Sequence, residues 1–290
     1  MHHPPAMIAK LLAATSIGTL CVLGGAFGIA NSPAPAAAAD PVESGRFVWH
    51  DLLTANMGAA KRFYGDLFGW HFEDSKRGNR PYVIARLPSG PVAGLIDVRG
   101  IADAGQQWLS YMAVVDIDKT VAVAQLDGAR VLAPPRDLPL ARAAVVADPQ
   151  GAPLGLAQLR GNNPDLAQPT PGHFFWQEYL AKDAVKALEF YRRLAGYEPA
   201  ISDSRLGIEY HLLKKASGGA GLFQLPATVV DVQPNWLPYV LVDNPEAIAT
   251  RVIALGGRIL LPAAPERRNR SLVVIADPGG APLALQKYPF

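Results

Sequence analysis

The sequence contains little cysteine and little charge. Cys21 is its single cysteine in 290 residues, and charged residues make up 18% of the chain. One cysteine excludes an intramolecular disulfide and a cysteine-based zinc site. The formal net charge of +2 is too close to balance to indicate a nucleic-acid partner. The densest basic cluster, residues 267–270, is short and is typical of a solvated loop rather than a phosphate site.

The longest uncharged run of the sequence lies at the N-terminus. Lys10 precedes the uncharged stretch 11–30, which is followed by NSPAPAAAADP. This pattern predicts a secretory signal over residues 1–39, cleaved after Ala39, and therefore an exported (periplasmic or secreted) protein. An uncleaved membrane anchor is the alternative, because the stretch is about as long as a membrane span. A lipoprotein signal would use Cys21, but Leu20 stands where a small residue is wanted.

The rest of the chain is a tandem repeat. Three segments recur in the same order at offsets of 127, 128 and 129 residues, which indicates a duplication with single-residue insertions. The segments are 47–70 with 174–197, 108–135 with 236–263, and 145–159 with 274–288.

The repeat predicts two domains joined by a linker. We expect domain 1 over 46–159 and domain 2 over 173–288, which together account for nearly all of the chain after the signal. The segment between them, 160–172, is rich in Pro, Gly and Asn and is typical of a linker. Each domain is long enough to have its own hydrophobic core.

The same order of elements is expected twice within each half. Residues 46–54 alternate and are aromatic-rich, which predicts a strand. Asn56 caps the following helix and Gly69 ends it. Its expected buried face comprises Ala59, Phe63, Leu67 and Phe68. Short strands follow, and then the strand–helix–strand order starts again near residue 109. The chain therefore contains four βαβββ modules and belongs to the α+β class.

Two motifs in this order resemble those of a known family. FYGDLFGW (63–70) follows an aromatic strand and has an echo in FYRRLAGY (190–197), while ADPQGAPLGL (147–156) closes the first half. Together they resemble the vicinal oxygen chelate superfamily, which includes glyoxalases, extradiol dioxygenases and bleomycin-resistance-like proteins. The resemblance implies tandem domains in which two modules form an open, U-shaped β-barrel around one pocket. In the family, metal ligands point inward from the first strand of each module and from the last strands.

The residues at these implied ligand positions are poor metal ligands. A divalent metal needs three or four converging His or carboxylate groups, and neither half offers such a set in register. We therefore expect no metal site and no cofactor, with a divalent metal as the less favoured alternative. His50 is the best single candidate, although a lone histidine is more often a packing or surface residue. The implied positions hold Trp49, Trp176, Ser110, Pro238, Gly155 and Ala284.

Two acids at matching places in the first strands are the candidate polar anchors. Alternate strand residues share a face, so Asp51 and Glu178 are expected to point inward, and His50 and Gln177 to point away. A buried carboxylate in an apolar pocket can bind a ligand or act as a base. The alternative for Asp51 is an ion pair with Arg86 or Arg142. The expected ligand contacts are Trp49, Asp51, Ser110, Trp176, Glu178 and Gln286.

Three functions are compatible with this pattern. The favoured one is an exported protein that binds a small molecule in one or both pockets without a metal. The second is a metal-dependent lyase, isomerase or dioxygenase of the superfamily. The third is an envelope factor that binds another macromolecule. We expect a small-molecule partner, no nucleic acid, and membrane contact only through an uncleaved N-terminal segment. Catalytic residues and oligomeric state are not assigned from the sequence.

Export can be tested on the mature protein. Cleavage after Ala39 should leave a chain that starts near Asp40 and has no cysteine. N-terminal sequencing and the intact mass of the exported protein measure this directly. A mature chain that still contains Cys21 contradicts the cleaved signal.

Overall fold

The computed structural model describes residues 44–77, 80–101, 105–160, 169–203, 210–215, 218–229, 232–265 and 268–287. The expected signal and most of the expected linker lie outside these residues. Among the described helices, none is both long and apolar enough to cross a membrane.

The first half forms one mixed sheet from two βαβββ modules. Its eight strands lie in the order β2-β3-β4-β1-β5-β8-β7-β6, with β1 and β5 antiparallel at the centre. The first module comprises β1 (Phe47–Thr54), α2 (Met57–Phe68), β2 (His71–Arg77), β3 (Arg80–Leu87) and β4 (Gly90–Asp97). The second comprises β5 (Gln107–Ala113), α3 (Ile117–Leu126), β6 (Arg130–Asp137), β7 (Ala141–Ala147) and β8 (Pro153–Leu159).

The second half repeats this topology. Its sheet has the order β10-β11-β12-β9-β13-β16-β15-β14, with β9 and β13 antiparallel at the centre. The third module comprises β9 (Phe174–Ala181), α4 (Ala184–Ala195), β10 (Glu198–Asp203), β11 (Tyr210–Lys215) and β12 (Gly218–Gln224). The fourth comprises β13 (Asn235–Leu241), α5 (Pro245–Ala254), β14 (Arg258–Leu261), the short turn η1 (Arg268–Arg270), β15 (Leu272–Ala276) and β16 (Pro282–Gln286). The predicted α+β fold with four modules is confirmed, and both sheets are open.

The expected helix signals work as predicted at the ends of α2. The Asn56 side chain accepts a hydrogen bond from Ala59 N at 3.0 Å. Gly69 ends the helix in the left-handed conformation, φ 73°, which glycine adopts without a steric cost.

The buried face of α2 differs from the expected one. Two of the four expected residues are buried, but Ala60 and Tyr64 are buried in place of Ala59 and Phe68. The expected face takes into account only the packing of α2 against its own sheet. In the structure α2 also contacts α5 of the other half. Tyr64 is therefore buried in the contact region between the two halves, here called the seam.

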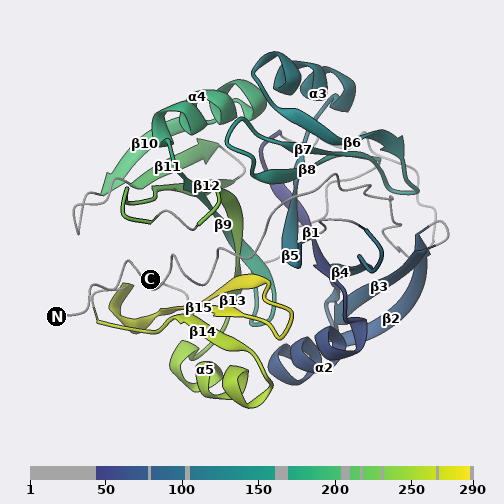
Figure 1. Ribbon diagram of the computed structural model, residues 1–290, viewed down its shortest axis with the longest axis vertical. Helices are drawn as coiled ribbons and strands as arrows, with labels where there is room; N and C mark the ends of the chain where they lie inside the picture. The colour runs from purple at the N-terminus through teal and green to yellow at the C-terminus, as the bar shows by residue number, and fades with distance from the viewer. Residues whose placement is uncertain are drawn as a thin grey trace.

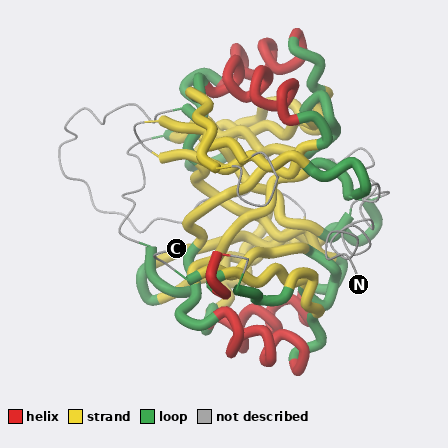
Figure 2. Tube along the Cα trace, turned by 90° about the vertical axis from the view of Figure 1, so that its left-hand side faces the viewer, coloured by secondary structure: helices red, strands yellow, loops and turns green. Residues whose placement is uncertain are grey.

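The helices of the two halves lie side by side in pairs. Figure 1 shows α3 beside α4 at one end of the molecule and α2 beside α5 at the other, with β1, β5, β9 and β13 between them. In the view of Figure 2 the strands fill the middle and the helices cover two opposite ends. Each helix pair therefore joins a module of one half to a module of the other.

Hydrophobic clusters on the helix-bearing side are shared between the halves. One cluster combines buried residues of the second module, including Met112 and Leu156, with those of the third, including Tyr191. A second combines the first module with the fourth. The inner faces of the two sheets each have a separate cluster. The two halves thus have separate inner faces but a common outer core.

Tyr64 of the FYGDLFGW motif crosses this seam. Its hydroxyl donates to Asp277 Oδ2 at 3.1 Å and accepts from Trp108 Nε1 at 3.0 Å. Asp277 belongs to the DPGG turn of the other half, where its Oδ1 accepts from Gly279 N and Ala281 N, both at 2.9 Å. Burial raises the pKa of Asp277 despite these donors.

The equivalent residues make the reciprocal bond. Tyr191 of FYRRLAGY donates to Asp148 Oδ2 at 2.8 Å and accepts from Trp236 Nε1 at 2.9 Å. Tyr179 also donates to Asp148. Burial raises the pKa of Asp148 as well. Each helix motif therefore binds the closing turn of the opposite half, as in a two-fold symmetric interface.

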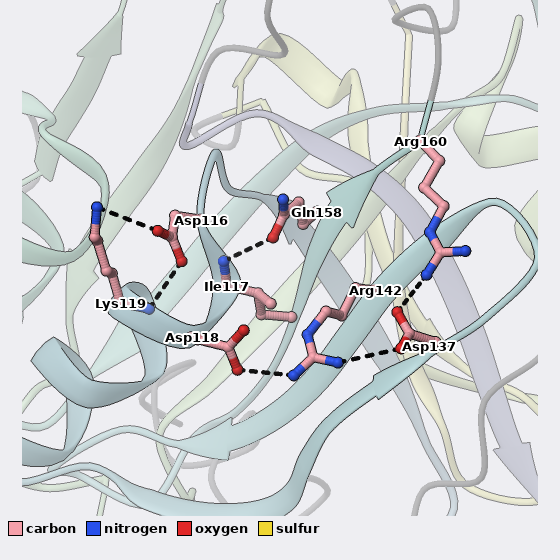
Figure 3. A network of polar contacts seen from close by, with 8 residues as sticks. All are labelled: Asp116, Ile117, Asp118, Lys119, Asp137, Arg142, Gln158 and Arg160. Carbon is pink, nitrogen blue, oxygen red and sulfur yellow. Dashed lines mark hydrogen bonds and ion pairs between the residues drawn. The ribbon is translucent and has the colours of Figure 1, made fainter.

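Arg142 lies in a network of polar contacts at the outside of the first half. Its guanidinium donates to Asp118 at 2.9 Å and to Asp137 at 3.4 Å, and Arg160 also donates to Asp137 (Figure 3). Arg86 instead donates to Glu73 at 2.6 Å. Both arginines considered as partners for Asp51 thus have other carboxylate partners.

The seam can be tested by removing one hydroxyl at a time. Tyr64→Phe leaves the buried Asp277 with one donor fewer, and Tyr191→Phe does the same to Asp148. Leaving a buried acceptor without its donor costs about 1–3 kcal/mol. We expect each variant to lower the free energy of unfolding by that amount in urea titrations. Asp66→Asn, at an exposed position of α2, is the matched control and should leave it unchanged. Unaltered stability in both tyrosine variants would contradict the role of the seam.

Candidate ligand-binding site

The inner face of the first half places Trp49 and Asp51 together. A register shift in β1 between Phe47 and Trp49 inserts one extra residue, a β-bulge. Asp51 Oδ1 accepts from Trp49 Nε1 at 2.9 Å and from Tyr82 Oη at 2.9 Å. All three residues are buried, with Asp51 completely covered. Tyr111 pairs with Trp49 across the strands and belongs to the same face.

The inner face of the second half has the same frame with different side chains. Glu178 takes the place of Asp51, and its carboxylate accepts from Tyr210 Oη at 2.9 Å and from Tyr239 Oη. Arg268 donates to the same carboxylate and forms an ion pair with it. Burial and the charge of Glu178 raise the pKa of both tyrosines, so both hydroxyls remain protonated donors near neutral pH.

Two equivalent glycines make room for these acids. Gly94 pairs with Asp51 on the neighbouring strand, and Gly221 pairs with Glu178. A side chain at Gly94 would overlap with the Tyr82 hydroxyl and the Asp51 carboxylate, and one at Gly221 would overlap with Tyr210. The absence of Cβ atoms at these positions therefore permits the tyrosine–carboxylate contacts in both halves.

Arg268 reaches the site from an unusual backbone. Residues 268–270 have φ values of 47°, 49° and 63°, in the left-handed region, which costs non-glycine residues about 1–2 kcal/mol each. Side-chain contacts oppose this cost, because Arg268 binds Glu178 and Gln286 while Arg270 donates to Glu246 at 3.0 Å. The Arg268 guanidinium carbon also lies 5.6 Å from the ring centroid of Tyr239, within cation–π range.

The two inner faces differ in exposure. In the first half Trp49 is 8% exposed, and it belongs to a cluster of buried apolar side chains. In the second half Phe175, Trp176 and Phe223 pack against the inner cluster but are only partly buried. Partly exposed aromatic rings beside a neutralised carboxylate are the usual composition of a small-molecule site. The second half is therefore the candidate ligand-binding site.

The structure separates Ser110 from the other expected contacts. Ser110 pairs with His50 across the strands, while Leu109 pairs with Asp51, so Ser110 shares the face of His50. Its hydroxyl donates to Gln177 Oε1 at 3.0 Å across the seam between the halves. Gln286, in contrast, accepts a hydrogen bond from Arg268 at the second inner face. The face of Ser110 depends on the register between β1 and β5, which the alternation within one strand does not determine.

His50 and Gln177 lie at the seam, on the face opposite to Asp51 and Glu178. They are equivalent positions in the two halves, and the Gln177 amide contacts His50 Nε2 directly. The His50 ring stacks on Phe174 with the ring centroids 3.9 Å apart. Burial lowers the pKa of His50 to about 3, which keeps the ring neutral at physiological pH.

The described side chains do not fit a divalent metal. Within those residues, no three His, Cys, Asp or Glu side chains converge. Glu178 is already bonded to two tyrosines and an arginine, and the positions expected to carry family ligands include Trp49, Trp176 and Gly155. A metal needs several converging charged or imidazole ligands, which this arrangement does not supply.

Sequence reasoning missed the tyrosines and Arg268. Tyr111 and Tyr239 were visible as identical positions in WLSY and WLPY, and both lie beside the acids. Tyr82 and Tyr210 occupy equivalent strands but could be aligned only through strand pairing. The short basic cluster that contains Arg268 predicts a solvated loop, and nothing local in the sequence indicates that its side chain turns inward.

Comparison with known proteins identifies the family. The sequence profile of the Glyoxalase/Bleomycin resistance protein/Dioxygenase superfamily matches residues 46–156. CFP32 of Mycobacterium bovis and Mycobacterium tuberculosis, which carries a glyoxylase name, is 30% identical over 244 residues, covering 82% of this chain and 93% of CFP32. The chain belongs to this superfamily. The anthracycline biosynthesis protein DauV of a Streptomyces species is 29% identical over 259 residues, covering 80% of this chain and 90% of DauV.

Solved structures of the superfamily share the fold. The Mn(II)-bound glyoxalase from Novosphingobium aromaticivorans superposes with a TM-score of 0.56 at 13% identity, covering 84% of this chain and 82% of the glyoxalase. An extradiol ring-cleaving dioxygenase from B. fuscum gives a TM-score of 0.56 at 14% identity, covering 88% and 75%. At these identities the likeness concerns the fold alone.

The buried His50 predicts acid sensitivity. Unfolded His50 takes up a proton below pH 6.5, whereas the folded residue does so only near pH 3. The unfolded state therefore binds more protons in this window, and stability falls as the pH is lowered through it, by up to about 1.4 kcal/mol per pH unit. Urea unfolding at pH 7 and pH 5 measures the loss. His50→Gln should show a smaller loss, and an equal loss in both proteins would exclude His50 as its source.

Proposed function

We propose that this protein binds a small, planar, largely apolar molecule on the inner face of its second half, without a divalent metal. The observation that carries the proposal is the combination of two features: Glu178 is paired with Arg268 and hydrogen-bonded to two tyrosines, and the rings of Phe175, Trp176 and Phe223 nearby are partly exposed. Aromatic rings provide a large contact area, and a few fixed polar groups orient the ligand.

The difference between the halves supports a single site. At the first inner face Trp49, Asp51, Tyr82 and Tyr111 are all buried, so a ligand there would have to displace packed side chains. Repacking a filled core costs more than covering rings that are already accessible. In this proposal the first inner face has a structural role and the second binds the ligand.

Relatives support a planar aromatic ligand. DauV and DnrV, both 29% identical to this chain, are named as anthracycline biosynthesis proteins. Their names concern their own biosynthetic role. They are compatible with a fold whose inner face accommodates fused aromatic rings, and the proposal for this chain rests on its own exposed rings.

Export completes the proposal. The N-terminal pattern of a basic residue, an apolar stretch and small residues supports release of the mature protein outside the cytoplasm. A binding protein in that place would sequester or present its ligand rather than convert it.

A metal-dependent lyase, isomerase or dioxygenase is the second candidate. The observation in its favour is the fold shared with a Mn(II)-bound glyoxalase. The residues at the expected ligand positions oppose it, and metal analysis of the purified protein distinguishes the two. Ligand binding that is lost on addition of a chelator would favour the enzyme.

The site can be tested with matched bicyclic compounds. Ligand-observed NMR titrations with indane and 1-indanone should show binding of both to the wild-type protein. Trp176→Leu removes the indole surface at a partly exposed position, and we expect affinity for both compounds to fall by about tenfold, equivalent to about 1.4 kcal/mol.

The first half supplies the control. Trp49→Phe removes the indole N–H that Asp51 accepts in the first half but leaves the second inner face unchanged. Both affinities should therefore be unaltered, and thermal unfolding verifies that each variant is folded. A loss of affinity in Trp49→Phe but not in Trp176→Leu would place the site in the first half and contradict the proposal.

A further inference from the structure

Gln286 is a completely buried side chain on the inner face of the second half. Along β16, Ala284 belongs to the inner cluster, whereas Leu283 and Leu285 belong to the shared outer core. Gln286 therefore points inward with Ala284, by the alternation of side chains along a strand. Its exposed fraction is 0%, and among the residues that the structure describes its Nε2 has no hydrogen-bond partner. Buried amide donors are nearly always bonded, so this one indicates a missing acceptor.

The orientation of the Gln286 amide is fixed by Arg268. Arg268 Nη1 donates to Gln286 Oε1, and a guanidinium has donors only. Exchanging the amide oxygen and nitrogen would place two donors against each other, so the alternative orientation is excluded. The unsatisfied group is thus an N–H donor, and its complement is an oxygen or nitrogen acceptor.

The donor is specific to the second half. The repeat aligns Gln286 with Ala157, which is buried in the inner cluster of the first half and has no polar side chain. Glu178 cannot attract a cationic ligand as a free carboxylate would, because Arg268 pairs with it. The site therefore combines apolar rings, a carboxylate paired with Arg268, and a buried donor for which the described residues supply no acceptor.

We propose that Gln286 Nε2 recognises a carbonyl oxygen of the bound molecule, so that the ligand class is a neutral planar aromatic ketone or quinone. This inference rests on the proposed function and specifies its ligand. A carbonyl oxygen accepts one hydrogen bond from the amide and needs no countercharge. A planar hydrocarbon without an acceptor leaves Nε2 unsatisfied, and a carboxylate brings a charge that the paired Arg268 does not neutralise.

Access to Nε2 requires a neighbouring side chain to shift, and Arg268 is suited to this. Its side chain is 25% exposed, and residues 268–270 are held in the left-handed region by side-chain contacts rather than by backbone preference. Arg268 contacts Gln286 through Nη1 and Glu178 through Nη2. In this proposal the guanidinium moves at its Nη1 side to admit the carbonyl oxygen and keeps its ion pair with Glu178 through Nη2.

The test compares 1-indanone with indane, which differ in the carbonyl oxygen, and with indane-5-carboxylate as the anionic probe. In the wild-type protein 1-indanone should bind about tenfold tighter than either. Gln286→Met removes the amide while retaining the length of the side chain, and Gln286→Glu keeps an acceptor for Arg268 but cannot donate when ionised. Both variants should lose the preference for 1-indanone over indane. Gln233→Met, at an exposed position, should retain it.

A second measurement avoids substitutions at a buried position. The side-chain amide resonance of Gln286 in the wild-type protein should shift on addition of 1-indanone and not of indane. Equal affinities for the two compounds, or a preference that persists in both Gln286 variants, overturns the carbonyl assignment and leaves the proposed function intact. Absence of binding by all three probes overturns both.

Discussion

The reciprocal hydrogen bonds of Tyr64 with Asp277 and of Tyr191 with Asp148 organise this molecule. Each joins the helix motif of one half to the closing turn of the other, and each carboxylate also caps its own turn through two backbone N–H groups. A buried carboxylate is costly unless its acceptor sites are filled. The correct turn, helix and partner half must therefore form together, which couples the two sheets on their outer sides.

That coupling leaves the inner faces able to diverge. The helix-bearing faces are constrained by shared clusters and by the seam, whereas the hydrophobic cluster of each inner face is made, within the described residues, from its own half. Both inner faces have an acid, a glycine and two tyrosines at equivalent positions, but the surroundings of the acid differ between them. In the first half Asp51 is completely buried, and in the second Glu178 is joined by Arg268 and lies beside accessible rings. Structural and binding roles can thus be divided between equivalent surfaces.

Much of the fold could be predicted because its signals are local. The cap at Asn56, the left-handed Gly69 and the period-two pattern of β1 each depend on neighbouring residues. Because the sequence is a repeat, the elements predicted from them could be extended to the second half. The face of Asp51 and Glu178 followed from the same alternation. The partners of these acids could not be predicted in this way. Tyr82 and Tyr210 are brought to them by the register between strands, and Arg268 by a left-handed turn. The role of Tyr64 was hidden for the same reason: its partner is 213 residues away.

The contact between His50 and Gln177 affects which halves can pair with each other. They are equivalent positions that meet each other at the centre of the seam, where two identical halves would bring two copies of one side chain together. The neutral imidazole and the amide are complementary because they differ, one accepting and the other donating. Once such a pair has formed, neither half matches a copy of itself as well as it matches its covalent neighbour. The pair thereby disfavours the assembly of two first halves, or of two second halves, from different molecules.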